Sequence, residues 1–287
     1  MRLRRAPLVL VLPAAAVLAA CSSTTAGKGS EDTAAATAGS TSTSTSTSSA
    51  STSSASAPST TASTPADAHG LGALLQRGVA NVQSAHFTLD TKIATQSVTG
   101  TGDEKLDHGK VQAFRVTETI GSAGEIEIIL VDGKAYAKLP ATLNTSGKPF
   151  VLLSTNSSNA TIRQLAASIT SSLSSGASLQ SINALATAAT STRLVGKQEI
   201  NGVQATHYDL VIDPTKITTD PTTKQGLTQS GITSIPMQLY VDSQGRPVEV
   251  DENITVSGQT VTTKVALSRY NQPVTITAPP ASQVSTR

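Results

Sequence analysis

Apolar positions after residue 66 recur with two spacings, one typical of helices and one typical of strands. Leu71, Leu75 and Val79 recur every four residues, which predicts an amphipathic helix. From Phe87 onward apolar and polar residues alternate, which predicts strands with one buried face. The strands are expected over 87–93, 111–120, 126–130 and 135–139, with a hairpin turn at Asp132-Gly133 before the last of them.

The middle of the chain returns to a helical spacing. Ile162, Leu165 and Ile169 form one apolar stripe with Asn159 as its N-cap, and a second stripe covers residues 179–189. The polar sides of both stripes are Ser, Thr and Gln rather than charged residues. Because such helices are weak on their own in water, we expect a sheet to hold them.

Strand patterns return after residue 192 and continue to the C-terminus. Asn201-Gly202 predicts a hairpin, and Asp213-Pro214 predicts an N-cap followed by a short helical segment. One-sided alternation favours an antiparallel sheet with one face in water. The sequence therefore predicts an α+β domain over residues 66–287, which ends in a meander of strands at 236–242, 247–256, 260–270 and 273–276.

Composition and charge exclude several classes of partner. Aromatic residues make up 2% of the chain and Trp is absent, so sites that stack on sugars or bases are not expected. The formal charge is +2, and loss of Arg2, Arg4 and Arg5 with a leader would leave 2 − 3 = −1. No run of Lys or Arg remains, so we expect no nucleic-acid binding.

Motifs for catalysis or metal binding are missing. None of the four histidines has the spacing of a zinc site, and each is interpreted as a strand or loop residue. No phosphate loop, dinucleotide fingerprint, serine-hydrolase elbow or HExxH motif occurs. Residues 100–104 predict a turn, and Asp103, Glu104 and Asp107 predict a solvated acidic cluster there. We expect no metal, no cofactor and no enzymatic activity.

The N-terminus has the anatomy of a secretory signal. A basic start and the apolar run 8–17 lead through Leu18-Ala19-Ala20 to Cys21, the only cysteine. This ending resembles the lipobox of bacterial lipoproteins, which implies cleavage after residue 20 and lipidation of Cys21. Because two acyl chains anchor a protein stably, we expect the chain on the outer face of the cytoplasmic membrane. Residues 21–65 are almost entirely Ser, Thr, Ala and Gly, and predict a disordered tether behind the lipidated cysteine.

Three local segments carry a resemblance to a known family. They are residues 131–139 (VDGKAYAKL), residues 199–208 (EINGVQATHY) and the C-terminal block from Ile235 to Tyr270. These segments and the order of the predicted elements together resemble the mycobacterial LppX/LprG family of lipoproteins. The resemblance implies a U-shaped antiparallel half-barrel with helices on its concave side. It also implies an apolar cavity for the acyl chains of a lipid or lipoglycan, which such proteins carry within the cell envelope, with an envelope transport protein as a candidate partner.

Two interpretations of the apolar face remain open. A one-sided sheet covered by helices and poor in aromatics leaves either a ligand cavity or a tightly filled core. The alternative function is a structural or interaction lipoprotein that displays a protein-binding surface without a lipid ligand. The candidate cavity residues are Ile126, Ile128, Leu130, Ile162, Leu165, Ile169, Leu210, Met237 and Leu239.

Overall fold

The structure is a computed structural model, which describes residues 65–286 apart from 109, 142–143, 145, 161, 168–178, 219–220 and 257. The predicted signal segment, the lipobox cysteine Cys21 and the predicted tether up to residue 64 lie outside the described residues, as does the candidate cavity residue Ile169. No helix in the described part of the chain has both the length and the apolar character to span a membrane.

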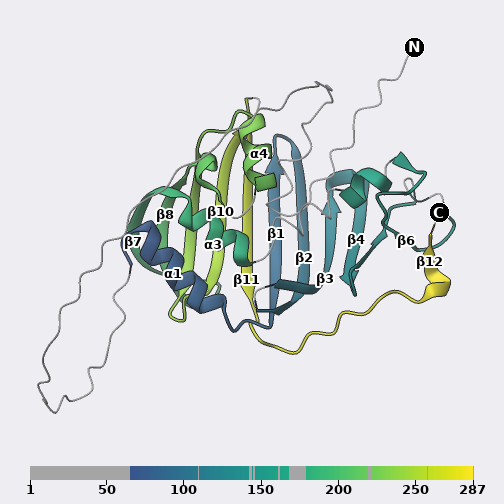
Figure 1. The fold of residues 1–287 in the computed structure, drawn as a ribbon, viewed down its shortest axis with the longest axis horizontal. Helices are drawn as coiled ribbons and strands as arrows, with labels where there is room; N and C mark the ends of the chain where they lie inside the picture. The colour runs from purple at the N-terminus through teal and green to yellow at the C-terminus, as the bar shows by residue number, and fades with distance from the viewer. Residues whose placement is uncertain are drawn as a thin grey trace, which may run out of the picture. The chain divides into compact units, whose positions relative to one another are not determined.

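Twelve strands of the described residues form one sheet (Figure 1). Its order is β12-β6-β5-β4-β3-β2-β1-β11-β10-β9-β8-β7, so the first and last long hairpins of the domain meet where β1 pairs with β11. The strands are β1 (Ser84–Ile93), β2 (Gln96–Asp107), β3 (Lys110–Ile120), β4 (Gly124–Val131), β5 (Lys134–Lys138), β6 (Phe150–Leu152), β7 (Ala189–Ile200), β8 (Val203–Ile212), β9 (Ile235–Asp242), β10 (Pro247–Val256), β11 (Gln259–Ser268) and β12 (Val284–Ser285).

Few helices accompany this sheet, so the predicted α+β class is confirmed. Figure 1 shows α1, α3 and α4 in front of strands β7 to β11. Their apolar side chains share one core cluster with residues of β8, β9 and β10. The helices are α1 (Ala68–Val79), a helical segment at 160–167, α3 (Leu179–Thr187) and α4 (Pro221–Gln229), with short 3-10 turns η1 (Gly121–Ala123), η2 (Pro214–Lys216) and η3 (Ala281–Gln283).

The helices cover one face of the sheet, which we call the inner face. It carries Leu89 of β1, Ile128 of β4 and Leu239 of β9, whereas the outer face carries the residues of opposite phase, such as Asp90 and Gln238. Leu71 and Leu75 of α1 are fully buried against this face, as the helical spacing predicted. A mainly polar outer face and an apolar inner face account for the alternation in the sequence, although Ala205, Tyr240 and Val248 form a small buried cluster that lies on the outer face.

Two predicted hairpin turns are confirmed by their backbone angles. Asp132 and Gly133 have φ of 51° and 69°, and Asn201 and Gly202 have φ of 52° and 79°. Two consecutive residues with positive φ are the mark of a type I′ turn, which matches the twist of the strands it joins. The predicted cap at Asp213 is also present, because its Oδ1 accepts a hydrogen bond from the Thr215 N–H at 2.9 Å.

Three expectations about strands were wrong. Residues 100–104 are not a turn, because they run through the middle of β2 between β1 and β3. Residues 273–276 form no strand, since this exposed segment after Pro273 makes no ladder and passes along the sheet toward β12 (Figure 1). The sheet is also not wholly antiparallel: β12 pairs in parallel with β6 through Val284 and Phe150.

Candidate functional site

The predicted cavity residues divide between two apolar clusters of the inner face. A third cluster on this face joins α1 and α3 to β2 and β11 through Val79, Leu179, Leu106 and Leu267. Leu210, Met237 and Leu239 belong to the cluster under α1, α3 and α4, which we call the β9 cluster. Ile126, Ile128, Ile162 and Leu165 belong to a cluster over β3 to β6, which we call the β4 cluster. Leu130 lies on the same face of β4 and is half-buried. The predicted residues are therefore on one face, but they form two groups.

Strands β11, β1 and β2 lie between these two clusters, and we call the inner-face patch formed by Leu89, Val98, Val261 and Gly100 the central zone. Leu89, Val98 and Val261 are 2%, 3% and 5% exposed, so this zone is buried. None of the three belongs to any apolar cluster that the described residues form. Gly100 and Gly102 supply no side chains on the same face of β2. The central zone is thus an apolar surface whose own side chains are few and small.

Polar groups interrupt the inner face around the central zone. Thr91 and Thr263 lie side by side on β1 and β11, and their hydroxyl oxygens are 3.3 Å apart in a hydrogen bond. Glu252 of β10, Glu104 of β2 and Glu118 of β3 are 9%, 5% and 1% exposed. Burial raises the pKa of Glu104 and of Glu118 to about 8, and that of Glu252 to about 7, because a charged carboxylate loses its water there. The sequence interpretation did not single out Glu118 or Glu252, and its expectation of a solvated acidic cluster was wrong for Glu104, which is buried.

A signal for Glu118 was present in the sequence. On β3 it occupies an inner-face position between Val116 and Ile120, both of which pack in or against the β4 cluster. A carboxylate is uncommon at a strand position where the alternation calls for an apolar residue, because charged side chains are seldom buried without a partner. Glu104 gave no such signal, because the segment around it was interpreted as a turn.

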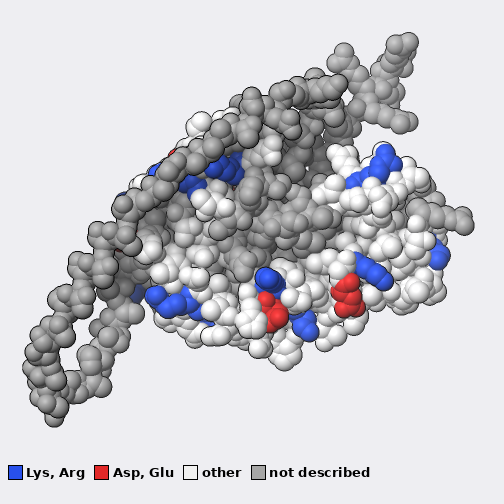
Figure 2. All heavy atoms as spheres, viewed as in Figure 1, with Lys and Arg blue, Asp and Glu red and all other residues white. Residues whose placement is uncertain are grey.

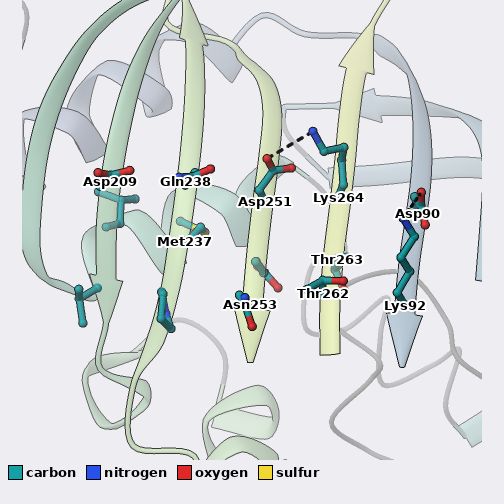
Figure 3. A pocket seen from close by; sticks show the side chains of 14 residues that line it. Asp90, Lys92, Asp209, Met237, Gln238, Asp251, Asn253, Thr262, Thr263 and Lys264 are labelled. Atoms are coloured by element: carbon teal, nitrogen blue, oxygen red, sulfur yellow. Dashed lines mark ion pairs between the residues drawn. The ribbon is translucent and has the colours of Figure 1, made fainter. Parts of the chain in front are cut away.

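The outer face holds a pocket of about 620 Å³ across five strands (Figure 3). One row of paired residues runs through it: Asp209 of β8, Gln238 of β9, Asp251 of β10, Lys264 of β11 and Asp90 of β1. Figure 3 shows these five side chains side by side on the same face of the strands. This polar row lies on the opposite face from Leu239 and Leu89, so it is separate from the central zone.

Ion pairs organise the polar row. Lys264 Nζ lies 2.9 Å from Glu249 Oε1 and 3.4 Å from Asp251 Oδ2. The hydrogen bond to Glu249 is the main reason that the pKa of Lys264 is raised, and burial is the main reason that the pKa of Asp251 is raised. Asp209 is paired with Arg193, and Asp90 Oδ2 lies 3.7 Å from Lys92 Nζ. The row is therefore a network of opposite charges rather than a single-sign surface.

The remaining chemistry of the described residues is sparse. His86 lies on β1 and His207 on β8, as expected, but His69 lies within α1. His207 stacks on Tyr240 with ring centroids 4.4 Å apart. No three His, Cys, Asp or Glu residues within the described ranges are grouped so that they could hold a metal ion. On the face drawn in Figure 2, basic and acidic side chains of the described residues are few and scattered among uncharged ones.

Comparison with proteins of known structure places two mycobacterial lipoproteins among the similar folds. LppX of Mycobacterium tuberculosis is 14% identical with a TM-score of 0.48, and the match covers 73% of this chain and 99% of LppX. LprF of Mycobacterium bovis is 15% identical with a TM-score of 0.46, over 75% of this chain and 99% of LprF.

MucB, a further similar structure, is 14% identical with a TM-score of 0.38, over 78% of this chain and 64% of MucB. No protein-family model matches the chain, and no curated protein matches it. Mycobacterial lipoproteins of the kind that the sequence resembles are thus among the solved structures similar to this chain.

Proposed function

We propose that the protein is a lipid-anchored envelope protein that binds the acyl chains of a lipid or lipoglycan on the inner face of its sheet and carries them within the envelope. In this proposal the sheet curves into a U-shaped half-barrel around the bound chains. The observation that carries it is the central zone, where Leu89, Val98 and Val261 are buried but join no apolar cluster of the described residues.

Acyl chains match this surface in chemistry and in length. Each methylene removed from water contributes about 0.8 kcal/mol, so a chain lying on the central zone would bind through burial alone. The two clusters lie on either side of β11, β1 and β2, and adjacent strands are about 4.8 Å apart. A chain crossing these three strands would therefore lie along roughly 10–15 Å of apolar surface and meet an apolar cluster at each end.

A wedge in the central zone tests the proposal. Val98→Trp fills the inner face of β2, and Thr99→Trp places the same side chain on the exposed outer face of the same strand. We expect the wild type and Thr99→Trp to copurify with non-covalently bound lipid and to take up a fluorescent fatty acid. Val98→Trp should lose most of both. Native mass spectrometry and organic extraction measure the bound lipid, and circular dichroism checks that both variants fold.

A second wedge acts from the helical side. Ala166 is 4% exposed in the β4 cluster, so Ala166→Trp should also reduce the amount of bound lipid. A wild-type protein without extractable lipid and without uptake of the probe would contradict the proposal. Equal lipid in the Val98→Trp and Thr99→Trp variants would place the ligand elsewhere than on the central zone.

Attachment to the membrane through acylated Cys21 is the other part of the proposal. Cys21→Ala removes the thiol that a lipobox makes the acceptor of the lipid. We expect the wild type to partition into detergent and to carry the mass of the acyl groups, and the variant to be unprocessed or released. Intact mass and phase partitioning measure the difference, and equal partitioning of the two proteins would contradict the anchor.

The outer pocket favours a second candidate function, the display of a surface to a partner protein. Its polar row spans five strands, and the neighbouring edge formed by β7 and β8 carries four exposed large apolar side chains: Leu194, Val195, Val203 and Val211. A protein that binds no lipid but loses a copurifying envelope protein when Asp251 is replaced by Arg would favour this function over lipid carriage.

A further inference from the structure

Glu118 is a buried carboxyl on the border of the central zone. It is 1% exposed, and its strand neighbours in register are Gly100 on β2 and Ile126 on β4. A Cβ atom at Gly100 would lie 3.2 Å from Glu118 Cγ and 3.6 Å from Leu89 Cβ. The side chain of Glu118 therefore leans over the space that Gly100 leaves open, toward Leu89 and the central zone.

Both carboxyl oxygens of Glu118 are unpaired. Each is buried, and neither has a hydrogen-bond partner among the described residues. A buried acceptor without a partner has lost the hydrogen bonds that water gives it in the unfolded chain, so this arrangement is unfavourable for the unliganded fold. A polar side chain that is held at such a cost, beside an apolar surface, points to a missing partner at the same place.

Among the residues that the structure describes, no basic group of the neighbouring elements faces Glu118. Arg115 of β3 and Glu127 of β4 pair with each other on the outer face. Arg163, in the helical segment over the β4 cluster, donates to the backbone oxygens of Ser157 and Ser158. The nearest titratable residue of the inner face on β2 is Glu104, four residues from Gly100 along the strand. A neutral carboxyl is the form that such surroundings favour.

We propose that Glu118 donates a hydrogen bond from its protonated carboxyl to a carbonyl oxygen in the ester, amide or carboxyl group of the bound lipid. The inference rests on the proposed lipid binding and adds a substrate class to it. The ligand is an acyl lipid whose carbonyl group lies beside β2 and β3, and a plain hydrocarbon would leave Glu118 unpaired. The raised pKa of Glu118 supports the protonated form at neutral pH.

Two probes of matched length test the inference on the full-length protein. Methyl dodecanoate offers a carbonyl oxygen, whereas tetradecane has none. Binding is measured by displacement of a fluorescent fatty acid. We expect the wild type to bind the ester about fivefold more tightly than the alkane, since a buried hydrogen bond contributes about 1 kcal/mol. Glu118→Gln should keep the preference, because its amide still donates a hydrogen bond.

Apolar variants should lose the preference without losing the fold. In Glu118→Leu and Glu118→Met, the ester should bind no more tightly than the alkane, and the melting temperature should rise because an unpaired polar group has been removed. Glu252→Leu is the matched control, since it removes another buried inner-face carboxyl on β10 and should leave the preference intact. At pH 9 the wild type should lose the preference, because the carboxyl ionises, while Glu118→Gln should keep it.

The outcomes distinguish this inference from the proposed lipid binding on which it rests. A wild type that binds neither probe overturns both. A wild type that binds both probes, with the ester preference unchanged in Glu118→Leu and Glu118→Met, overturns the role of Glu118 and leaves lipid binding standing. If Glu252→Leu were the only variant to lose the preference for the ester, the contact would lie on β10, and the assignment to Glu118 would be overturned.

Discussion

Gly78 shows how one residue joins two distant parts of the fold. A Cβ atom at this position would lie 2.1 Å from the carbonyl oxygen of Gly245 and 2.2 Å from its carbonyl carbon. Gly245 has φ of 83° in the turn between β9 and β10, and a Cβ there would meet the Leu74 carbonyl oxygen at 2.6 Å. The backbone of α1 therefore touches the backbone of this turn. The sequence shows only that Gly78 weakens the helix; the contact explains why glycine is there.

Replacing Gly78 by alanine should destabilise the protein although alanine is the better helix former. Propensity alone would add about 1 kcal/mol to the free energy of unfolding. The backbone overlap forces α1 away from the turn, and such overpacking costs about 1–3 kcal/mol or more. We expect Gly78→Ala to lower the urea midpoint, and Gln76→Ala, on the exposed side of the same helix, to leave it nearly unchanged. Greater stability in Gly78→Ala would contradict the contact.

At the level of elements, the sequence predicted what local chemistry decides. The hairpins at Asp132-Gly133 and Asn201-Gly202 are fixed by residues that accept positive φ, so they could be predicted from two positions each. Helix α1 and the strands that contain Phe87, Ile126 and Val261 follow from periodicity, because one side of each element is buried. The same periodicity placed the candidate cavity residues of the strands on the inner face without showing that they divide between two clusters.

The elements that were missed depend on distant partners. Gly100, Gly102 and Asp103 are poor strand formers, and β2 exists because β1 and β3 pair with it on both sides. A Cβ at Gly102 would meet the Arg115 carbonyl oxygen at 2.4 Å and the Phe87 ring at 2.6 Å, so glycine is required by packing rather than by a turn. The parallel pairing of β12 with β6 joins residues more than one hundred positions apart, and no local pattern predicts it.

At the scale of the whole molecule, three buried carboxyls make the fold sensitive to pH. The pKa of Glu104 and Glu118 rises to about 8 and that of Glu252 to about 7, from a value of 4.5 for the free side chain. Above pH 4.5 the unfolded chain releases these protons first, while the folded chain keeps them. The folded state then binds more protons, so the free energy of unfolding must fall as the pH rises from about 5 to about 8.

This fall can be measured and assigned to individual residues. Each carboxyl contributes at most about 1.4 kcal/mol per pH unit within its window, so urea midpoints at pH 5 and pH 8 should differ clearly. Glu118→Gln should reduce the decrease of the free energy of unfolding with pH. The triple variant, which also carries Glu104→Gln and Glu252→Gln, should remove most of this decrease. Any bound lipid must be removed first, because a ligand that binds only the folded state adds its own stabilisation and masks the slope. A stability that rises between pH 5 and pH 8, or a slope unchanged in the triple variant, would show that these carboxyls are already ionised or solvated in the fold. In that case the inner face could not hold a neutral carboxyl for a lipid carbonyl.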